Sequence, residues 1–172
     1  MAGTGHYLDA VAGVVTQIAA NTTSAGAGDS DKLVALNGSG QVDITMMPTG
    51  IGPDTATLVA KEAVAAGAFV NVVLDSGTLK VQNADNSAAG KQADGFVLTA
   101  QPTPGQSALV YFNGINNALS GLTPLGAKVY LGTVGASVTT PPSSSGNVVQ
   151  YLGKILTATS IQFQPMDPIT LA

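Results

Sequence analysis

The sequence predicts a mainly β protein, a compact antiparallel β-sandwich or small β-barrel that follows an extended N-terminal arm with a short helix. The first observation is tract 122–163, LTPLGAKVYLGTVGASVTTPPSSSGNVVQYLGKILTATSIQF, where apolar runs alternate with Gly, Pro and Ser at nearly even spacing. The second is that turn-forming residues separate nearly all the apolar runs of residues 55–172. The third is length, since 172 residues fit one ordinary domain plus an extension. We therefore expect an arm over 1–54 and a β domain over 55–172.

The first expected element is a short amphipathic helix over residues 6–20. Apolar side chains recur there at increments of one, three and four, and Asp9 near the start favours the helix dipole. An isolated helix of about four turns is marginal in water, so its apolar stripe needs a surface to lie on. Docking on its own domain and docking on a neighbouring subunit are both open. The contact residues expected on this stripe are Leu8, Val11, Val15 and Ile18.

The rest of the arm is expected to be a linker and an extended segment. Residues 21–31, NTTSAGAGDSD, are small and polar without apolar periodicity, which indicates a linker. Residues 32–54 predict an extended segment with one hairpin or turn at Asn37-Gly38, closed by Pro and Gly near its end. Its apolar side chains are the second set of candidate contacts: Leu33, Leu36, Val42, Ile44, Met46 and Met47.

The β domain is expected to hold nine short strands, bounded by Gly, Pro, Asn, Asp or Ser. Their predicted ranges are 57–61, 68–74, 78–82, 95–100, 108–112, 127–131, 136–139, 148–156 and 160–164. Residues 62–67, EAVAAG, favour one helical turn that ends at Gly67.

Charge is scarce in this chain, at 9% of residues against about 25% in an average soluble protein. The six cationic residues are isolated lysines, the chain has no arginine, and the net charge is -4. Such a chain has little with which to neutralise phosphates, so no nucleic-acid partner is expected. A surface this poor in charge suits a protein that packs against copies of itself or another protein.

Targeting signals and cysteine chemistry are not evident. The chain has no cysteine, which excludes disulfides, thiolate zinc sites and thiol nucleophiles. No apolar run approaches the ~20 residues that span a bilayer, and the N-terminus does not resemble a secretory signal. We expect a soluble protein made in the cytoplasm, with no membrane partner.

The sequence predicts no enzyme, cofactor or metal site. His6 is the only histidine and lies far in sequence from any grouping of serine and acid, so neither a catalytic triad nor a two-histidine metal site is expected from one chain. Asp75, Asp85 and Asp94 lie around residues 76–93, where a lectin could bind calcium, but their spacing matches no calcium loop. Turn formation, as in Asp75-Ser76-Gly77 and Asp94-Gly95, is the favoured role.

Two groups of residues resemble structural proteins of tailed bacteriophages. Residues 30–50, SDKLVALNGSGQVDITMMPTG, are similar to a segment that recurs in phage tail fibres and head proteins. AGAFVNVV, KVQNADNSAAGKQADGFVLTA and LTPLGAKVYLGTVGASVTTPPSSSGNVVQYLGKIL resemble the β domain of phage capsid cement or decoration proteins. The similarity covers most of residues 30–165.

This resemblance implies a homotrimer on the outer surface of an icosahedral capsid. There it would bridge neighbouring subunits of the major capsid protein in the virion, after synthesis in the host cytoplasm. Short decoration proteins often lack a segment like residues 1–30, so the resemblance assigns no role to the helix expected over 6–20.

Two other classes remain open. A trimeric tail-fibre or head-fibre module would bind a host surface glycan, and residues 111–117, YFNGINN, offer Tyr and Asn for it. A hairpin with an Asn113-Gly114 turn is favoured for that stretch. The third class, a depolymerase or peptidoglycan hydrolase, lacks an acid pair or metal ligands.

Overall fold

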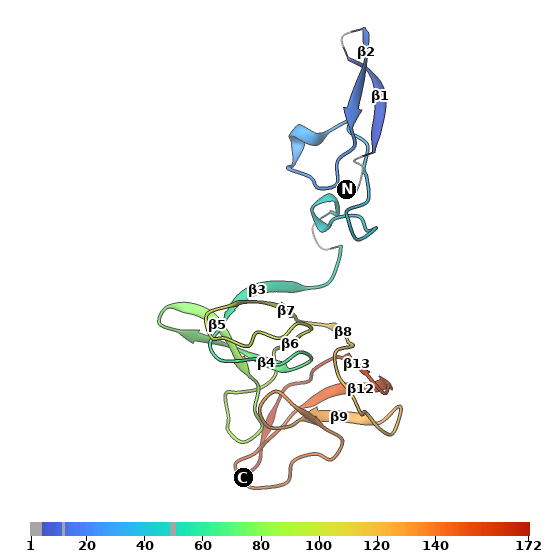
Figure 1. The fold of residues 1–172 in the computed structure, drawn as a ribbon. Helices are drawn as coiled ribbons and strands as arrows, with labels where there is room; N and C mark the ends of the chain where they lie inside the picture. The colour runs from blue at the N-terminus through green and yellow to red at the C-terminus, as the bar shows by residue number, and fades with distance from the viewer. Residues whose placement is uncertain (1–4, 12, 49–50) are drawn as a thin grey trace. The chain divides into compact units, whose positions relative to one another are not determined.

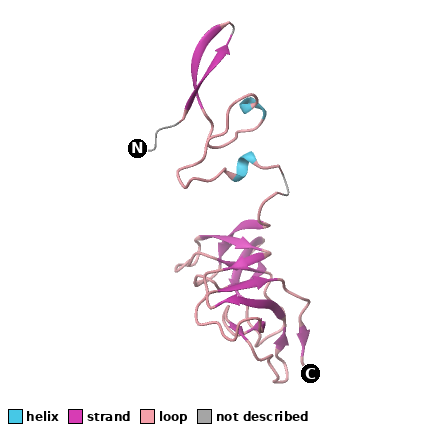
Figure 2. Cartoon of the chain, turned by 90° about the vertical axis from the view of Figure 1, so that its right-hand side faces the viewer, coloured by secondary structure: helices cyan, strands magenta, loops and turns pink. Residues whose placement is uncertain are grey.

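The computed structural model describes residues 5–11, 13–48 and 51–172 of the chain. It divides into two compact units, residues 1–52 and residues 53–172, which we call the N-terminal unit and the C-terminal unit. Strands make up nearly all the regular structure, and the helical segments among the described residues are two single 3-10 turns, η1 (Ala27–Asp29) and η2 (Ile44–Met46) (Figure 2). The predicted mainly β class is confirmed.

The N-terminal unit begins with a β-hairpin, so the helix predicted over residues 6–20 is wrong. Strands β1 (His6–Val11) and β2 (Val14–Ala19) pair antiparallel (Figure 1). Gly13, at φ 80°, adopts a left-handed backbone conformation that a helix interior does not contain. Val14, Val15, Thr16 and Ile18 are β-branched, and such side chains favour strands over helices.

Backbone hydrogen bonds order the remainder of the N-terminal unit. Asn21 forms a parallel bridge with Val34, in which the N–H of Asn21 donates to Leu33 and the N–H of Ala35 donates to Asn21. The predicted turn forms at residues 37–41, where the side chain of Asn37 accepts from the backbone N–H groups of Ser39 and Gln41. No described residue of this unit is buried, so polar contacts hold it together.

The C-terminal unit contains a closed five-stranded barrel. Its strand order is β3-β5-β4-β6-β7, and every pair is antiparallel except β3 with β5. Alternate residues point inward, as on any strand, and fill the barrel with Val70, Val81, Val97, Ala108 and Val110. The bounds are β3 Thr55–Ala60, β4 Phe69–Asp75, β5 Thr78–Asn83, β6 Gly95–Val97 and β7 Ser107–Tyr111.

A second sheet follows the barrel in sequence and packs on its outside. Its strand order is β10-β9-β12-β13-β8, and all its pairs are antiparallel. A separate pair joins β11 to β14 near the C-terminus. The bounds are β8 Gly114–Asn116, β9 Lys128–Leu131, β10 Ser137–Val138, β11 Val148–Val149, β12 Tyr151–Thr157, β13 Ser160–Phe163 and β14 Ile169–Thr170.

Three phenylalanines join the barrel to this sheet. Phe69 and Phe96 lie on the barrel's outer face, because their neighbours Val70 and Val97 point inward. The ring of Phe163, from β13, lies 5.6 Å from that of Phe69 and 5.4 Å from that of Phe96. The core between the layers is completed by Ala84, Ala93, Val129, Leu131, Leu152, Ile155 and Ile161.

All nine predicted strands of residues 55–172 overlap observed strands, with the predicted 148–156 divided into β11 and β12. Two local predictions are wrong. Residues 62–67 form no helical turn, since Val64 pairs with Gln101 in an isolated β-bridge. The Asn113-Gly114 hairpin is absent, because β7 belongs to the barrel while β8 pairs with β13 in the other sheet.

Candidate functional site

The predicted contact residues of the N-terminal unit are mostly exposed to solvent. Leu8, Val15 and Ile44 have 73%, 70% and 59% of their surface accessible. Ile18 and Met46 are half-buried, and the side chain of Val11 lies outside the described residues. The other exposed members are Leu33, Leu36, Val42 and Met47.

The hairpin distributes its apolar side chains over both faces. Leu8 and Val15 share one face, since Leu8 is opposite Gln17 and Val15 is opposite Ala10. Ile18 is opposite Tyr7 on the other face. The single stripe expected from a helix is therefore replaced by a two-sided ribbon. A lone two-stranded hairpin is marginally stable in water, so this ribbon needs a partner surface.

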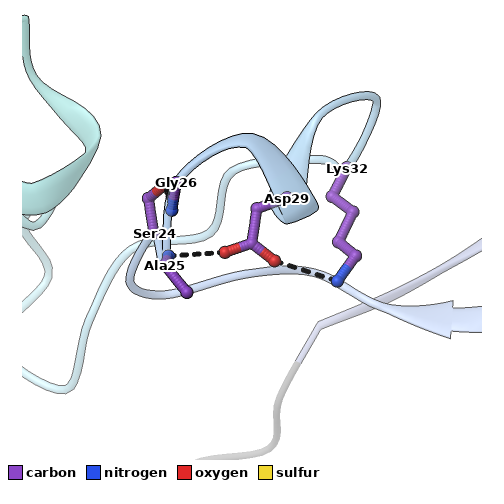
Figure 3. A network of polar contacts seen from close by, with 5 residues as sticks. All are labelled: Ser24, Ala25, Gly26, Asp29 and Lys32. Carbon is purple, nitrogen blue, oxygen red and sulfur yellow. Dashed lines mark hydrogen bonds and ion pairs between the residues drawn. The ribbon is translucent and has the colours of Figure 1, made fainter.

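Asp29 organises the loop that joins the hairpin to the extended segment (Figure 3). Its carboxylate accepts from the backbone N–H of Ala25 at 2.6 Å and from the Lys32 ammonium at 2.9 Å. These two bonds, and then the Asn21 side chain, lower the pKa of Asp29 to about 2 from its ordinary 3.8. The segment predicted to be a linker is thus fixed by an ion pair and a local hydrogen bond.

The acidic residues around 76–93 serve structural roles. Asp75 pairs with Lys80 at 2.9 Å beside a turn in which Ser76 and Gly77 both have positive φ. Asp85 accepts from the backbone N–H of Ser87. Asp94 binds the neighbouring strand β4, and half-burial of this carboxyl raises its pKa. No group of three or more potential metal ligands occurs within residues 5–11, 13–48 and 51–172.

The stretch 111–117 is used mainly for packing. The ring of Tyr111 stacks on Phe96 at 5.4 Å, and Asn116 is fully buried, with its side-chain amide donating to the carbonyl of Gly67. Asn113 and Ile115 remain exposed beside a shallow hollow of about 500 Å³. Two of the side chains expected to bind a glycan are therefore engaged in the interior.

A hollow of the C-terminal unit, about 690 Å³ in volume, has no ionisable group in its lining. Hydroxyl groups of Ser120, Thr123, Ser137 and Thr139 alternate there with small apolar side chains. It offers neither metal ligands nor an acid and base for proton transfer.

One exposed apolar pair was missed by the sequence analysis. Leu74 and Leu79 are opposite each other at the end of the β4–β5 hairpin and are 68% and 54% accessible. The signal was present in the sequence, because both residues flank the turn Asp75-Ser76-Gly77 and opposite residues of a hairpin share a face.

Comparison with known proteins does not assign the chain to a family. Searches of protein-family models, of curated proteins and of solved structures found no match.

Proposed function

We propose that this chain is a virion structural protein that binds the outside of an icosahedral capsid as a homotrimer and cements neighbouring subunits of the major capsid protein. One observation carries the proposal. A C-terminal unit with its own core is joined to an N-terminal unit in which no described residue is buried and large apolar side chains are exposed. A unit whose described residues form no buried core, and which begins with a two-stranded hairpin, needs a covering surface that a protein partner can supply.

The proposal requires contact area and no reactive group. Residues 30–50 resemble a segment of phage tail fibres and head proteins, and the β unit resembles phage cement or decoration proteins. The exposed apolar side chains of residues 30–50 supply the contact area. In an assembly with symmetry, a modest contact is repeated at each equivalent position, so the total free energy becomes large without any tight single site.

The glycan-binding alternative receives less support. Its best candidate stretch, 111–117, holds Tyr111 against Phe96 and buries Asn116. A glycan site normally presents aromatic and amide side chains together in an accessible hollow.

The first experiment is the copy number of this chain per purified virion, measured by quantitative mass spectrometry against the major capsid protein. A ratio equal to one, or to a simple fraction such as one third, is expected for a cement protein. A ratio matching the few copies of a tail or portal component would overturn the proposal in favour of a fibre.

The second experiment measures binding of full-length variants to shells that lack the protein. We expect Leu8→Ser combined with Leu36→Ser to reduce shell occupancy at least about tenfold, because two exposed apolar side chains are lost from the proposed contact. Leu125→Ser is the matched control, since Leu125 is 66% accessible but belongs to the C-terminal unit. Equal occupancy for all three proteins would remove the N-terminal unit from the contact.

A further inference from the structure

Two lysines of the sheet β10-β9-β12-β13-β8, which we call the five-stranded sheet, are unusually placed. From Gly95 to Met166 the only charged residues are Lys128 and Lys154, and that range contains no acidic residue. The two are direct partners on neighbouring antiparallel strands, β9 and β12, and both are exposed. Like charges directly opposite each other destabilise a sheet, so their position is unfavourable to the isolated fold.

Within residues 5–11, 13–48 and 51–172, no ion pair joins a carboxylate to Lys128 or Lys154. The ion pairs among the described residues are Lys32 with Asp29 and Lys80 with Asp75, and neither includes a lysine of this sheet. An arrangement that costs stability in the isolated chain, at the only two charges of a long neutral stretch, indicates an anionic partner from outside it.

The surface around the two lysines suits a protein partner. Lys154 is also opposite Gln162, which is opposite Ile115, so one exposed row crosses four strands. A second row contains Tyr130 and Tyr151, whose rings meet edge to face at 6.1 Å. Aromatic side chains are enriched at protein interfaces, so the two tyrosines next to the lysine pair favour a protein as the anionic partner.

The acidic counterpart is present in the N-terminal unit. Residues 1–52 contain four aspartates against one lysine. Asp29 is engaged with Lys32, and Asp43 caps η2 by accepting from Thr45. Asp31 lies in the loop that follows η1. Asp9 is the only acid of the β1–β2 hairpin and is exposed, and among the described residues it accepts from the backbone N–H of its neighbour Ala10 alone.

We propose that the Lys128 and Lys154 face of the five-stranded sheet binds the β1–β2 hairpin of a second copy of this chain, with Asp9 placed between the two ammonium groups. The contact joins two different surfaces of identical chains, and such heterologous contacts close into rings when the rotation between copies allows. The inference rests on the proposed homotrimer and identifies its subunit contact. It also supplies the covering surface that the hairpin lacks.

The test measures self-association of the full-length chain by sedimentation equilibrium at low and high salt. We expect trimers that weaken as salt screens the pair. Lys128→Glu with Lys154→Glu should lower the association constant at least about tenfold. Lys61→Glu with Lys91→Glu is the matched control, because it changes the net charge equally at two exposed lysines outside this sheet. Adding Asp9→Lys to the sheet variant should restore association.

Three results would overturn the inference: a wild-type chain that stays monomeric, equal losses in the sheet and control variants, or no rescue by Asp9→Lys. A monomeric wild-type chain is also the result expected if the hairpin docks within its own chain. Shell occupancy of the same variants separates this inference from the proposed function. A chain that occupies shells fully but does not self-associate would keep the capsid role and remove this contact.

Discussion

The two units of this chain are stabilised by different interactions. The C-terminal unit encloses two groups of buried side chains, one inside the barrel and one between the barrel and the five-stranded sheet. The N-terminal unit has no buried described residue and is held by hydrogen bonds and one ion pair. Hydrophobic burial dominates folding free energy, so the C-terminal unit has the main stabilising contribution within itself, whereas the described residues of the N-terminal unit lack it.

The largest expected effect is on the interlayer core. Phe163→Ala removes a ring that contacts both Phe69 and Phe96, and such a truncation costs about 3–5 kcal/mol. Urea unfolding followed by circular dichroism measures the loss in free energy of unfolding. A loss below about 1 kcal/mol would mean that the sheet does not depend on the barrel for its core.

A smaller effect is expected from the buried amide of Gln150. Its side chain accepts from the backbone N–H of Ala93 at 2.7 Å and donates to the Ala93 carbonyl at 2.9 Å. Gln150→Ala leaves both groups unpaired, which costs about 1–3 kcal/mol. Gln162→Ala, on the exposed face of the sheet, is the control and should stay within about 0.5 kcal/mol of the wild type. Equal stability of both variants would contradict the pairing.

The polar support of the N-terminal unit should depend on pH. The pKa of Asp29 is lowered to about 2 in the folded chain from an ordinary 3.8, so its stabilising effect is complete above about pH 4 and is lost as pH falls toward 2. Hydrogen exchange of residues 21–32 should accelerate in that window. Asp29→Asn should show the faster exchange at all pH values, and an unchanged pH profile in this variant would assign the effect to another group.

The smallest effect is expected from the exposed hairpin. Leu8→Ser should change the free energy of unfolding of the C-terminal unit by less than about 0.5 kcal/mol, because the side chain is 73% accessible and packs in no core. A loss above 1 kcal/mol in the monomer would show that the hairpin already has a partner surface within its own chain.

The strands of residues 55–172 were predictable because their signals are local. Turn residues such as Asp75-Ser76-Gly77 bound the apolar runs, and β4 and β5 pair across that turn. The Asn113-Gly114 dipeptide is the same kind of turn signal, but the hairpin predicted from it was wrong. Its neighbouring strand β8 finds its partner far along the chain, in β13, and no local pattern encodes a pairing at that separation.

The helix prediction for residues 6–20 failed for another reason. In so short a segment, apolar residues spaced by one, three and four positions fit a helix. The same spacing also fits a two-stranded ribbon that is exposed on both faces. Gly13 and the four β-branched residues after it carried the deciding information. The candidate contacts Leu33, Leu36 and Ile44 required no fold prediction, since large apolar residues within polar, turn-rich sequence are already unusual. The lysine pair needed the register of β9 and β12.

Strand β3, which follows the N-terminal unit, is hydrogen-bonded along one edge to β7 and along the other to β5. A force applied to the chain ahead of Thr55 therefore acts on a strand that β7 holds over Thr55–Val59 and that β5 also holds at Val59 and Ala60. Its hydrogen bonds share the load and must break together, in shear, instead of opening one after another as at a free edge. The start of β3 is thus a mechanical anchor, and the cement role proposed above would place it under load.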